Sequence, residues 1–228
     1  MNRLVHPEIL DSLPPADPRA VHSRRDLHRI NWWMRNHMLL ARALREHAPE
    51  APRAVTELGA GDGRFLLRLA GEMATAWPEV RATLLDREPV VARETLTALQ
   101  QLGWRPEVVQ ADVFDWAPAT PPEPVVIANL FLHHFEDEAL ARLLLTISQQ
   151  TDLFIALEPR RVSQPWICGQ LLRLIGCNDV TLHDGVVSVR AGFAGRELSA
   201  LWPDATNWQL AERRVGLFSH LFVAQRRR

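Results

Sequence analysis

Short apolar stretches alternate with amphipathic stretches between residues 53 and 157. The apolar stretches predict strands near 54–58, 80–86, 106–110, 124–130 and 152–157, and the helical spacing between them predicts helices near 63–76, 88–102 and 136–149. Such an alternation is typical of an α/β fold built on a doubly wound parallel sheet. Because ligands of these sheets bind beyond the carboxyl ends of the strands, we expect the chemistry to gather along one edge.

The flanking regions follow other patterns. Residues 1–22 contain four prolines and predict an extended arm, while Ser23 is expected to cap one helix that runs to about His47. In the C-terminal third, the predicted elements are a helix over 165–175, an irregular or extended segment over 181–190, a short helix over 197–202 and a β-hairpin of 208–215 and 219–225.

Composition narrows the class of protein. The 228 residues carry a formal net charge of −1 without long blocks of like charge, which argues against a nucleic-acid-binding stripe. Two cysteines without metal-binding or redox spacing fit a reducing, cytoplasmic setting, and we expect neither a signal peptide nor a membrane-spanning run. Because the chain has no lysine and no tyrosine, proton transfer would fall to His, Asp, Glu, Cys or water.

The first predicted strand ends in a glycine-rich turn, Glu57-Leu58-Gly59-Ala60-Gly61-Asp62-Gly63. A dinucleotide fingerprint would need a small third residue at position 64, where Arg64 stands instead. Glu57 and Asp62 would repel a pyrophosphate but suit a ligand with positive charge, such as the ammonium and sulfonium of S-adenosylmethionine.

This turn resembles the first motif of class I S-adenosylmethionine-dependent methyltransferases of the small-molecule type, such as quinone-pathway or polyketide-tailoring enzymes. Leu84-Leu85-Asp86, Gln110-Ala111-Asp112-Val113-Phe114 and the stretch that ends in Leu132-His133-His134-Phe135 resemble its later motifs. The resemblance implies a Rossmann-like fold: a seven-stranded, mostly parallel sheet with an antiparallel C-terminal hairpin, plus an N-terminal helical cap. It also implies an arm and cap over 1–50 and a methyltransferase domain over 51–228, in which 160–205 help form the acceptor pocket.

The resemblance further implies a cofactor site for S-adenosylmethionine. Its residues would be Glu57, Gly59, Ala60, Gly61, Asp86, Arg87, Asp112, Val113 and Asn129. Within this set, Asp86 would bind the ribose hydroxyls, Asp112 and the Val113 backbone the adenine, and Asn129 would lie beside the amino-acid portion. Asp86 and Asp112 could instead cap the turns that follow them, because aspartate is favoured at such positions.

Three histidines are candidate catalytic bases, because a neutral imidazole accepts a phenolic proton near pH 7. His133 and His134 follow the fourth strand, and His183 lies in the variable region; each could equally be structural. We favour His133 for its proximity and place His183 second. No spacing supports a metal site, and none is expected.

Three further residues are candidates for acceptor binding. Trp32 and Trp33 would form an aromatic lid, or would pack on the core or on a dimer partner. Arg190 would orient a carboxylate or phenolate.

The predicted function is transfer of a methyl group to oxygen or carbon of a small aromatic, quinone-precursor or polyketide-like acceptor, typical of secondary metabolism. One alternative is a non-catalytic S-adenosylmethionine-binding regulator or scaffold. Another is a protein or RNA methyltransferase, although 129–132 lack the prolines of the nucleic-acid amino-methylase motif and no charged docking stripe occurs. We expect no nucleic-acid partner and no stable membrane insertion, and a homodimer remains open.

Overall fold

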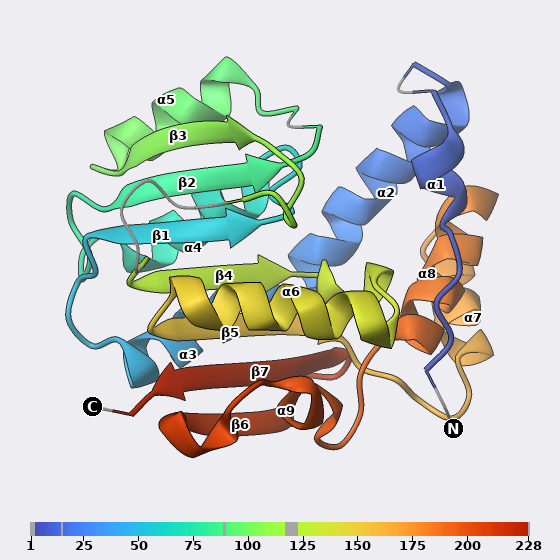
Figure 1. Ribbon diagram of the computed structural model, residues 1–228. Coiled ribbons are helices and arrows are strands. Elements are labelled where there is room, and N and C mark those ends of the chain that lie inside the picture. The colour runs from blue at the N-terminus through green and yellow to red at the C-terminus, as the bar shows by residue number, and fades with distance from the viewer. Residues whose placement is uncertain (1–2, 15, 89, 117–122, 228) are drawn as a thin grey trace.

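A computed structural model describes residues 3–14, 16–88, 90–116 and 123–227. The described chain forms a seven-stranded sheet in the order β3-β2-β1-β4-β5-β7-β6 (Figure 1). Its strands are β1 (Ala54–Leu58), β2 (Arg81–Asp86), β3 (Arg105–Gln110), β4 (Val125–Asn129), β5 (Leu153–Pro159), β6 (Trp208–Val215) and β7 (Ser219–Arg226). Strands β1 to β5 pair in parallel, β7 pairs antiparallel with β5, and β6 pairs antiparallel with β7. This arrangement confirms the predicted fold class.

Each face of the sheet carries its own apolar core, because the residues of a buried strand alternate between the two faces. On β5, Ile155 and Leu157 join one core while Phe154 and Ala156 join the other. The first core packs against α3 (Asn36–His47), α4 (Arg64–Met73) and α5 (Arg93–Gln101). The second core packs against α6 (Asp137–Gln150) and α9 (Glu197–Leu201). Both faces are therefore covered, as a parallel sheet requires.

The N-terminal region is more helical than predicted. A short helix, α1 (Ile9–Ser12), lies within the expected extended arm, and α2 (Pro18–Met34) begins five residues before Ser23 because Asp17 caps it and Pro18 occupies its first turn. The single helix expected as far as His47 is also wrong. Arg35, with a φ of 52°, breaks it into α2 and α3, and the chain changes direction there.

The segment 181–190, expected to be irregular, is part of helix α8 (Asp179–Ala191), which packs beside α7 (Trp166–Leu174). Asn178 caps α8 by accepting from the Thr181 N–H. The β-branched residues that disfavour a helix here are overruled by tertiary contacts, since the Thr181 hydroxyl lies within hydrogen-bond distance of Ser23 and Asp26 of α2.

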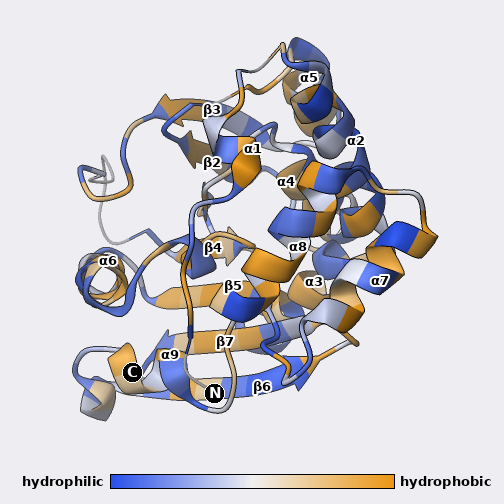
Figure 2. Cartoon of the chain, turned by 90° about the vertical axis from the view of Figure 1, so that its right-hand side faces the viewer, coloured by the Kyte–Doolittle hydropathy of each residue, from blue (hydrophilic) through white to orange (hydrophobic). Residues whose placement is uncertain are grey.

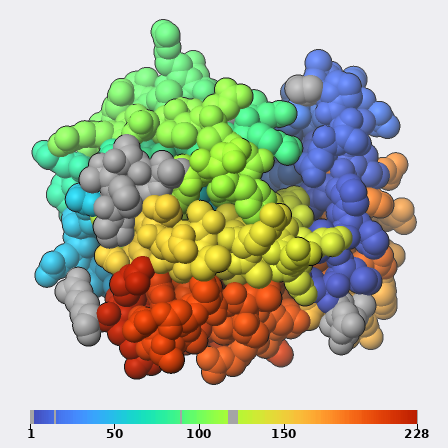
Figure 3. Space-filling view, in the orientation of Figure 1, coloured from blue at the N-terminus to red at the C-terminus, as the bar shows by residue number. Residues whose placement is uncertain are grey.

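Helices α1 and α2 and the α7–α8 pair together form a layer next to the carboxyl ends of the parallel strands. In Figure 1 the arrows of β1 to β4 point toward this layer, and Figure 3 shows its N-terminal part, in blue, along one side of the molecule. Among the described residues, no helix combines the length and the apolar character needed to cross a membrane.

Candidate functional site

The strand order reverses between β1 and β4, and a cavity of about 380 Å³ opens beyond their carboxyl ends. A reversal of this kind is where open α/β sheets bind ligands. Its walls come from the glycine turn and α4, the ends of β4 and β5, the 3₁₀ helix η1 (Leu132–His134), the cap helices α2 and α3, α8 and the N-terminal arm. The lining residues used below are Glu8, His28, Asn31, His37, Glu57, Gly59, Ala60, Gly61, Arg68, Asn129, His133, His134 and Ser188.

The glycine turn is shaped by three residues with positive φ: Gly59 (69°), Gly61 (52°) and Gly63 (72°). A Cβ on Gly59 would lie 2.2 Å from the Phe131 ring, and one on Gly63 would lie 2.5 Å from Leu84, so both positions exclude side chains. A Cβ on Gly61 would meet nothing within 4 Å. Gly61 therefore leaves its backbone open to a ligand in the cavity.

Glu57 lies beneath this turn with 2% of its surface exposed. Its Oε2 atom has no hydrogen-bond partner among the described residues, and the same holds for Oδ1 of Asn31, which lines the cavity from α2. Burial, together with the carboxylates of Asp62 and Asp86, raises the pKa of Glu57 well above its ordinary value. Two buried acceptors thus lie ready for a ligand that brings donors and positive charge.

The predicted ribose and adenine residues lie outside the lining of this cavity. Asp86 accepts from the N–H groups of Gly61 and Glu88, each at 2.8 Å, and Asp112 accepts from the Phe114 N–H at 2.9 Å. Both aspartates therefore shape turns, which was the alternative reading of them, and a carboxylate oxygen has lone pairs left for a hydroxyl or amino donor. Arg87 is exposed, and Val113 is buried in the core.

Asn129, at the end of β4, lies in the cavity wall and is held by a buried chain of side chains. Its Oδ1 accepts from Nδ2 of Asn36 on α3 at 2.9 Å, and Oδ1 of Asn36 accepts from the Ser219 hydroxyl at 2.9 Å. Asn36 is 1% exposed. The cap, the end of β4 and the C-terminal hairpin are thus joined at the site.

The histidine motif is positioned by Glu158, a fully buried residue near the end of β5. Its carboxylate accepts from the backbone N–H groups of Phe131, Leu132 and His133, at 3.0, 2.8 and 3.3 Å. The same carboxylate lies 2.8 Å from Nδ1 of His133. One buried anion therefore fixes both the backbone of η1 and the orientation of the imidazole.

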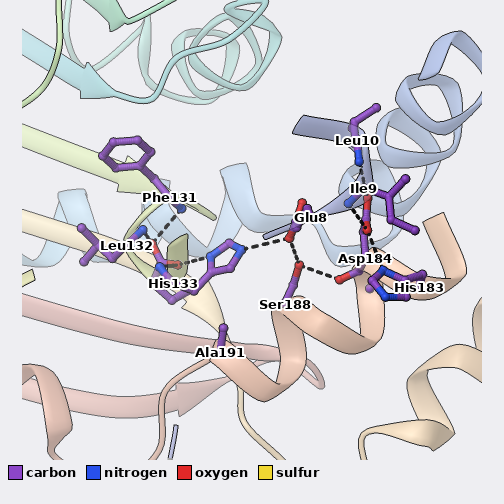
Figure 4. A network of polar contacts seen from close by, with 12 residues as sticks. Glu8, Ile9, Leu10, Phe131, Leu132, His133, His183, Asp184, Ser188 and Ala191 are labelled. Carbon is purple, nitrogen blue, oxygen red and sulfur yellow. Dashed lines mark hydrogen bonds and ion pairs between the residues drawn. The ribbon is translucent and has the colours of Figure 1, made fainter. Parts of the chain in front are cut away.

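Figure 4 shows His133 directed toward Glu8 of the N-terminal arm, and the contact of its Nδ1 atom with Glu158 lies on the other side of the ring. The His133 Nε2 atom lies 3.8 Å from Glu8 Oε1, and Ser188 of α8 donates to the same carboxylate. Burial disfavours the imidazolium, but the contacts with Glu158 and Glu8 outweigh it and raise the pKa of His133 to about 9. At neutral pH His133 is a cation, so this geometry argues against the general-base role that we expected for it.

His134, the next residue, is exposed and lines the cavity, with its ring centroid 4.2 Å from that of His133. Desolvation at the cavity wall and the adjacent His133 cation lower the pKa of His134, which favours its neutral imidazole. Glu8, His133 and His134 offer atoms within 4.8 Å of one another. Because Glu8 and His133 already interact with Ser188 and Glu158, the cluster has the partners it needs without a metal ion.

Sequence reasoning missed a basic wall on the opposite side of the cavity. His28 of α2, His37 of α3 and the half-buried Arg68 of α4 line it. Burial lowers the pKa of both histidines. A pattern in the sequence could have revealed this wall, because Arg24, His28 and Asn31 recur at helical spacing on the face of α2 that meets the cavity.

Four predicted residues lie away from the cavity. Trp32 and Trp33 are 61% and 70% exposed rather than packed on the core, and they lie outside the cavity lining. An aromatic lid and packing on a dimer partner remain predictions. His183 is exposed and contacts Asp184, while Arg190 is exposed at the end of α8. The residue of α8 that lines the cavity is Ser188.

Comparisons with known proteins agree with this arrangement. Residues 55–151 match a family model described as a methyltransferase domain. The plantazolicin methyltransferase BpumL, solved with a triazolic desmethylPZN analog and SAH, is 11% identical and has a TM-score of 0.66, with 93% of each chain covered. No curated protein sequence matches the chain.

Two larger proteins share the fold. The pyocyanin biosynthetic protein PhzM is 19% identical with a TM-score of 0.63, covering 96% of this chain and 62% of its own. An O-methyltransferase family protein from Burkholderia thailandensis is 17% identical with a TM-score of 0.60, covering 94% of this chain and 63% of its own. The chain thus spans less than two thirds of the length of either protein.

Proposed function

We propose that this chain, a class I S-adenosylmethionine-dependent methyltransferase by its matched domain and its fold, methylates a small aromatic or polyketide-like acceptor. The observation that carries the proposal is a single cavity lined by two unlike groups, the unpartnered buried carboxyl group of Glu57 and the imidazole of His134.

The residues at the glycine turn fit the cofactor. The methionine end of S-adenosylmethionine brings an ammonium, which suits the unpartnered oxygens of Glu57 and Asn31, and the open backbone at Gly61 permits close approach. On the opposite wall, Arg68 would hold the methionine carboxylate. When bound, the cofactor supplies an electrophilic methyl group on a sulfonium.

The chain's own contributions are then alignment and proton removal. His134 would accept the proton of an acceptor hydroxyl, because its imidazole is neutral and faces the cavity. His133 would act as a positioning residue. Its positive charge disfavours protonation of His134 in the free enzyme, and its contact with Glu158 helps to fix the η1 backbone. The walls from α2, α3 and the N-terminal arm would exclude water.

Two lines support a small, flat acceptor. The cavity of about 380 Å³ has the size of a small-molecule site rather than of a groove for a macromolecule. Two of the proteins with this fold, PhzM and BpumL, belong by name to pyocyanin and plantazolicin biosynthesis. We further propose that residues 1–50 form the cap of a domain spanning 51–228, with 160–205 contributing Ser188 to the acceptor side.

The test measures radiolabelled methyl uptake from S-adenosylmethionine into a panel of phenols, naphthols and quinols, with wild type, His134→Gln and His183→Gln. We expect His134→Gln to lower turnover roughly 10²- to 10⁴-fold with cofactor affinity unchanged. His183→Gln is the matched control, because His183 is exposed and outside the cavity, and should retain activity.

The pH dependence of methyl transfer tests whether His134 removes the acceptor proton. If His134 is the base, activity lost in His134→Gln should recover at high pH, where the acceptor is already a phenolate. Cofactor binding without methyl uptake by any acceptor would contradict the enzyme proposal in favour of a regulator or scaffold. Full activity of His134→Gln at neutral pH would remove the base assignment.

A further inference from the structure

The outer side of the cap carries a cluster of exposed apolar side chains that the proposed reaction does not use. We call this the outer face and define it by Trp32, Trp33, Trp166, Ile167, Leu171, Leu174 and Ile175. Trp33 is 70% and Leu174 82% exposed, whereas soluble proteins usually bury side chains of this size. Figure 2 shows α7 at the periphery of the molecule, with hydrophobic segments along it.

The C-terminal end of α7 approaches α2. The Arg29 guanidinium of α2 donates to the carbonyl of Ile175, directly after α7, at 3.4 Å. Trp33 follows Arg29 by one helical turn and therefore projects from the same side of α2. The apolar residues at the end of α7 therefore adjoin the side of α2 that carries Arg29 and Trp33.

The charge around this surface is mainly positive. Neither 27–45 nor 159–178 contains an aspartate or glutamate. The exposed arginines of the two helices and the joint after α2 are Arg19, Arg25, Arg29, Arg35 and Arg173, of which Arg19 and Arg29 are paired with Asp17 and Asp26. Bulky aromatic and aliphatic side chains rimmed by arginine are the composition of surfaces that rest in the headgroup region of an anionic bilayer.

A second copy of the chain fits this surface poorly. In a two-fold dimer the outer face would meet itself, so arginines would lie against arginines without a carboxylate to pair them. An anionic lipid surface offers phosphate to each arginine and an apolar layer to each tryptophan.

We propose that the outer face docks the protein peripherally on anionic lipid membranes. Because α2 presents His28 and Asn31 to the cavity and Arg29 and Trp33 to the outer face, one helix separates the docked surface from the site. Docking would then place the cavity next to a source of apolar acceptors.

The experiment is flotation of the full-length protein with vesicles of phosphatidylcholine alone or with phosphatidylglycerol. We expect binding to the anionic vesicles that weakens in high salt, and little binding to the neutral ones. Trp32→Ser/Trp33→Ser/Leu174→Ser should weaken binding at least tenfold, and Arg25→Gln/Arg173→Gln roughly tenfold. Leu145→Ser, which removes an exposed apolar residue of α6, is the matched control and should bind like wild type.

Vesicle binding needs neither cofactor nor acceptor, so its result is independent of the proposed methyl transfer. All the substituted side chains are exposed, and circular dichroism checks that each variant folds. The proposal is overturned if wild type fails to float with anionic vesicles, or if Leu145→Ser loses as much binding as the triple variant. It is also overturned if sedimentation shows a dimer that the triple variant converts to monomer, since the outer face then binds a second copy.

Discussion

At the scale of single residues, Glu57 is the strongest indication of what the cavity binds. For a carboxyl group that is buried, unpartnered and next to two carboxylates, the pKa is raised well above its ordinary value, which favours the protonated form in the free protein. An ammonium placed against it favours the ionised form, so cofactor binding should release a proton. The affinity should therefore increase with pH until Glu57 is already ionised in the free protein.

Glu57→Gln tests this assignment. We expect cofactor affinity to fall roughly 10- to 150-fold, the range for losing a charged hydrogen bond. Calorimetry in buffers of different ionisation enthalpy should show proton release for wild type and none for the variant. The control ligand is 5′-methylthioadenosine, which lacks the amino-acid portion and should bind both proteins equally. Equal affinity of both proteins for S-adenosylmethionine would mean that the ammonium does not bind at Glu57.

His133 leads to a prediction about stability rather than catalysis. Its pKa is about 9 in the folded protein and near 6.5 when unfolded, so its contribution is complete below pH 6.5 and lost as pH rises through 9. The difference corresponds to about 3 kcal/mol of unfolding free energy. Denaturant unfolding at several pH values across that window should show this decline.

NMR titration identifies the group responsible for that decline. The imidazole signal that disappears in His133→Asn should titrate near pH 9 in wild type, and the His134 signal well below it. A His133 signal that titrates near 6.5 would contradict the ion-paired arrangement and would restore His133 as a candidate base.

At the scale of elements, the sequence predicted the strands and helices that a local apolar pattern determines. The parallel strands and the helices between them came from apolar periodicity, which a buried sheet imposes directly. The helix α8 was missed because its stabilising contacts lie more than 150 residues away in sequence, as in the bond from Thr181 to Ser23. The break at Arg35 was missed because a positive φ at arginine carries no signature in composition.

The same reasoning explains which site residues were predictable. The glycine turn and His134 are local motifs at strand ends, so pattern alone located them. Glu8 and Ser188 reach the site from opposite ends of the chain, and only the packed fold brings them to His133. The exposure of Trp32 and Trp33 could not be predicted, because the face of α2 that meets the cavity depends on how the helix packs against the rest of the chain.

Asn36 joins three elements, and its removal should show how strongly they are coupled. Asn36→Ala breaks the bonds to Asn129 and Ser219 in a buried site, with an expected loss of about 1–3 kcal/mol in unfolding free energy. Because Asn129 lies in the cavity wall, cofactor affinity should fall as well. Chemical denaturation and calorimetry measure the two effects.

The matched control for that variant is Asn207→Ala, since Asn207 is exposed and remote from the cavity, and it should change stability by less than about 0.5 kcal/mol. Loss of stability in Asn36→Ala without any change in cofactor affinity would show that the cap and the cofactor site are independent.

At the scale of the whole molecule, the cavity lies between two bodies: the sheet with its own helices, and the layer of α1, α2, α7 and α8. A ligand bound there contacts both, so it should stabilise the assembly as a unit. At a concentration one hundred times its dissociation constant, S-adenosylmethionine should add about 2.7 kcal/mol of stability. For a chain of this size, that corresponds to a rise in Tm of roughly 5–10 °C.

Thermal denaturation with S-adenosylmethionine and with NAD distinguishes the two nucleotide classes, because the carboxylates at the turn oppose a pyrophosphate. NAD should leave the Tm unchanged. Hydrogen exchange locates the effect: α2 should gain protection on cofactor binding along with the glycine turn, since both line the cavity. Protection confined to the sheet would mean that the cap does not close on the cofactor, and the water-excluding role proposed for it would have to be abandoned.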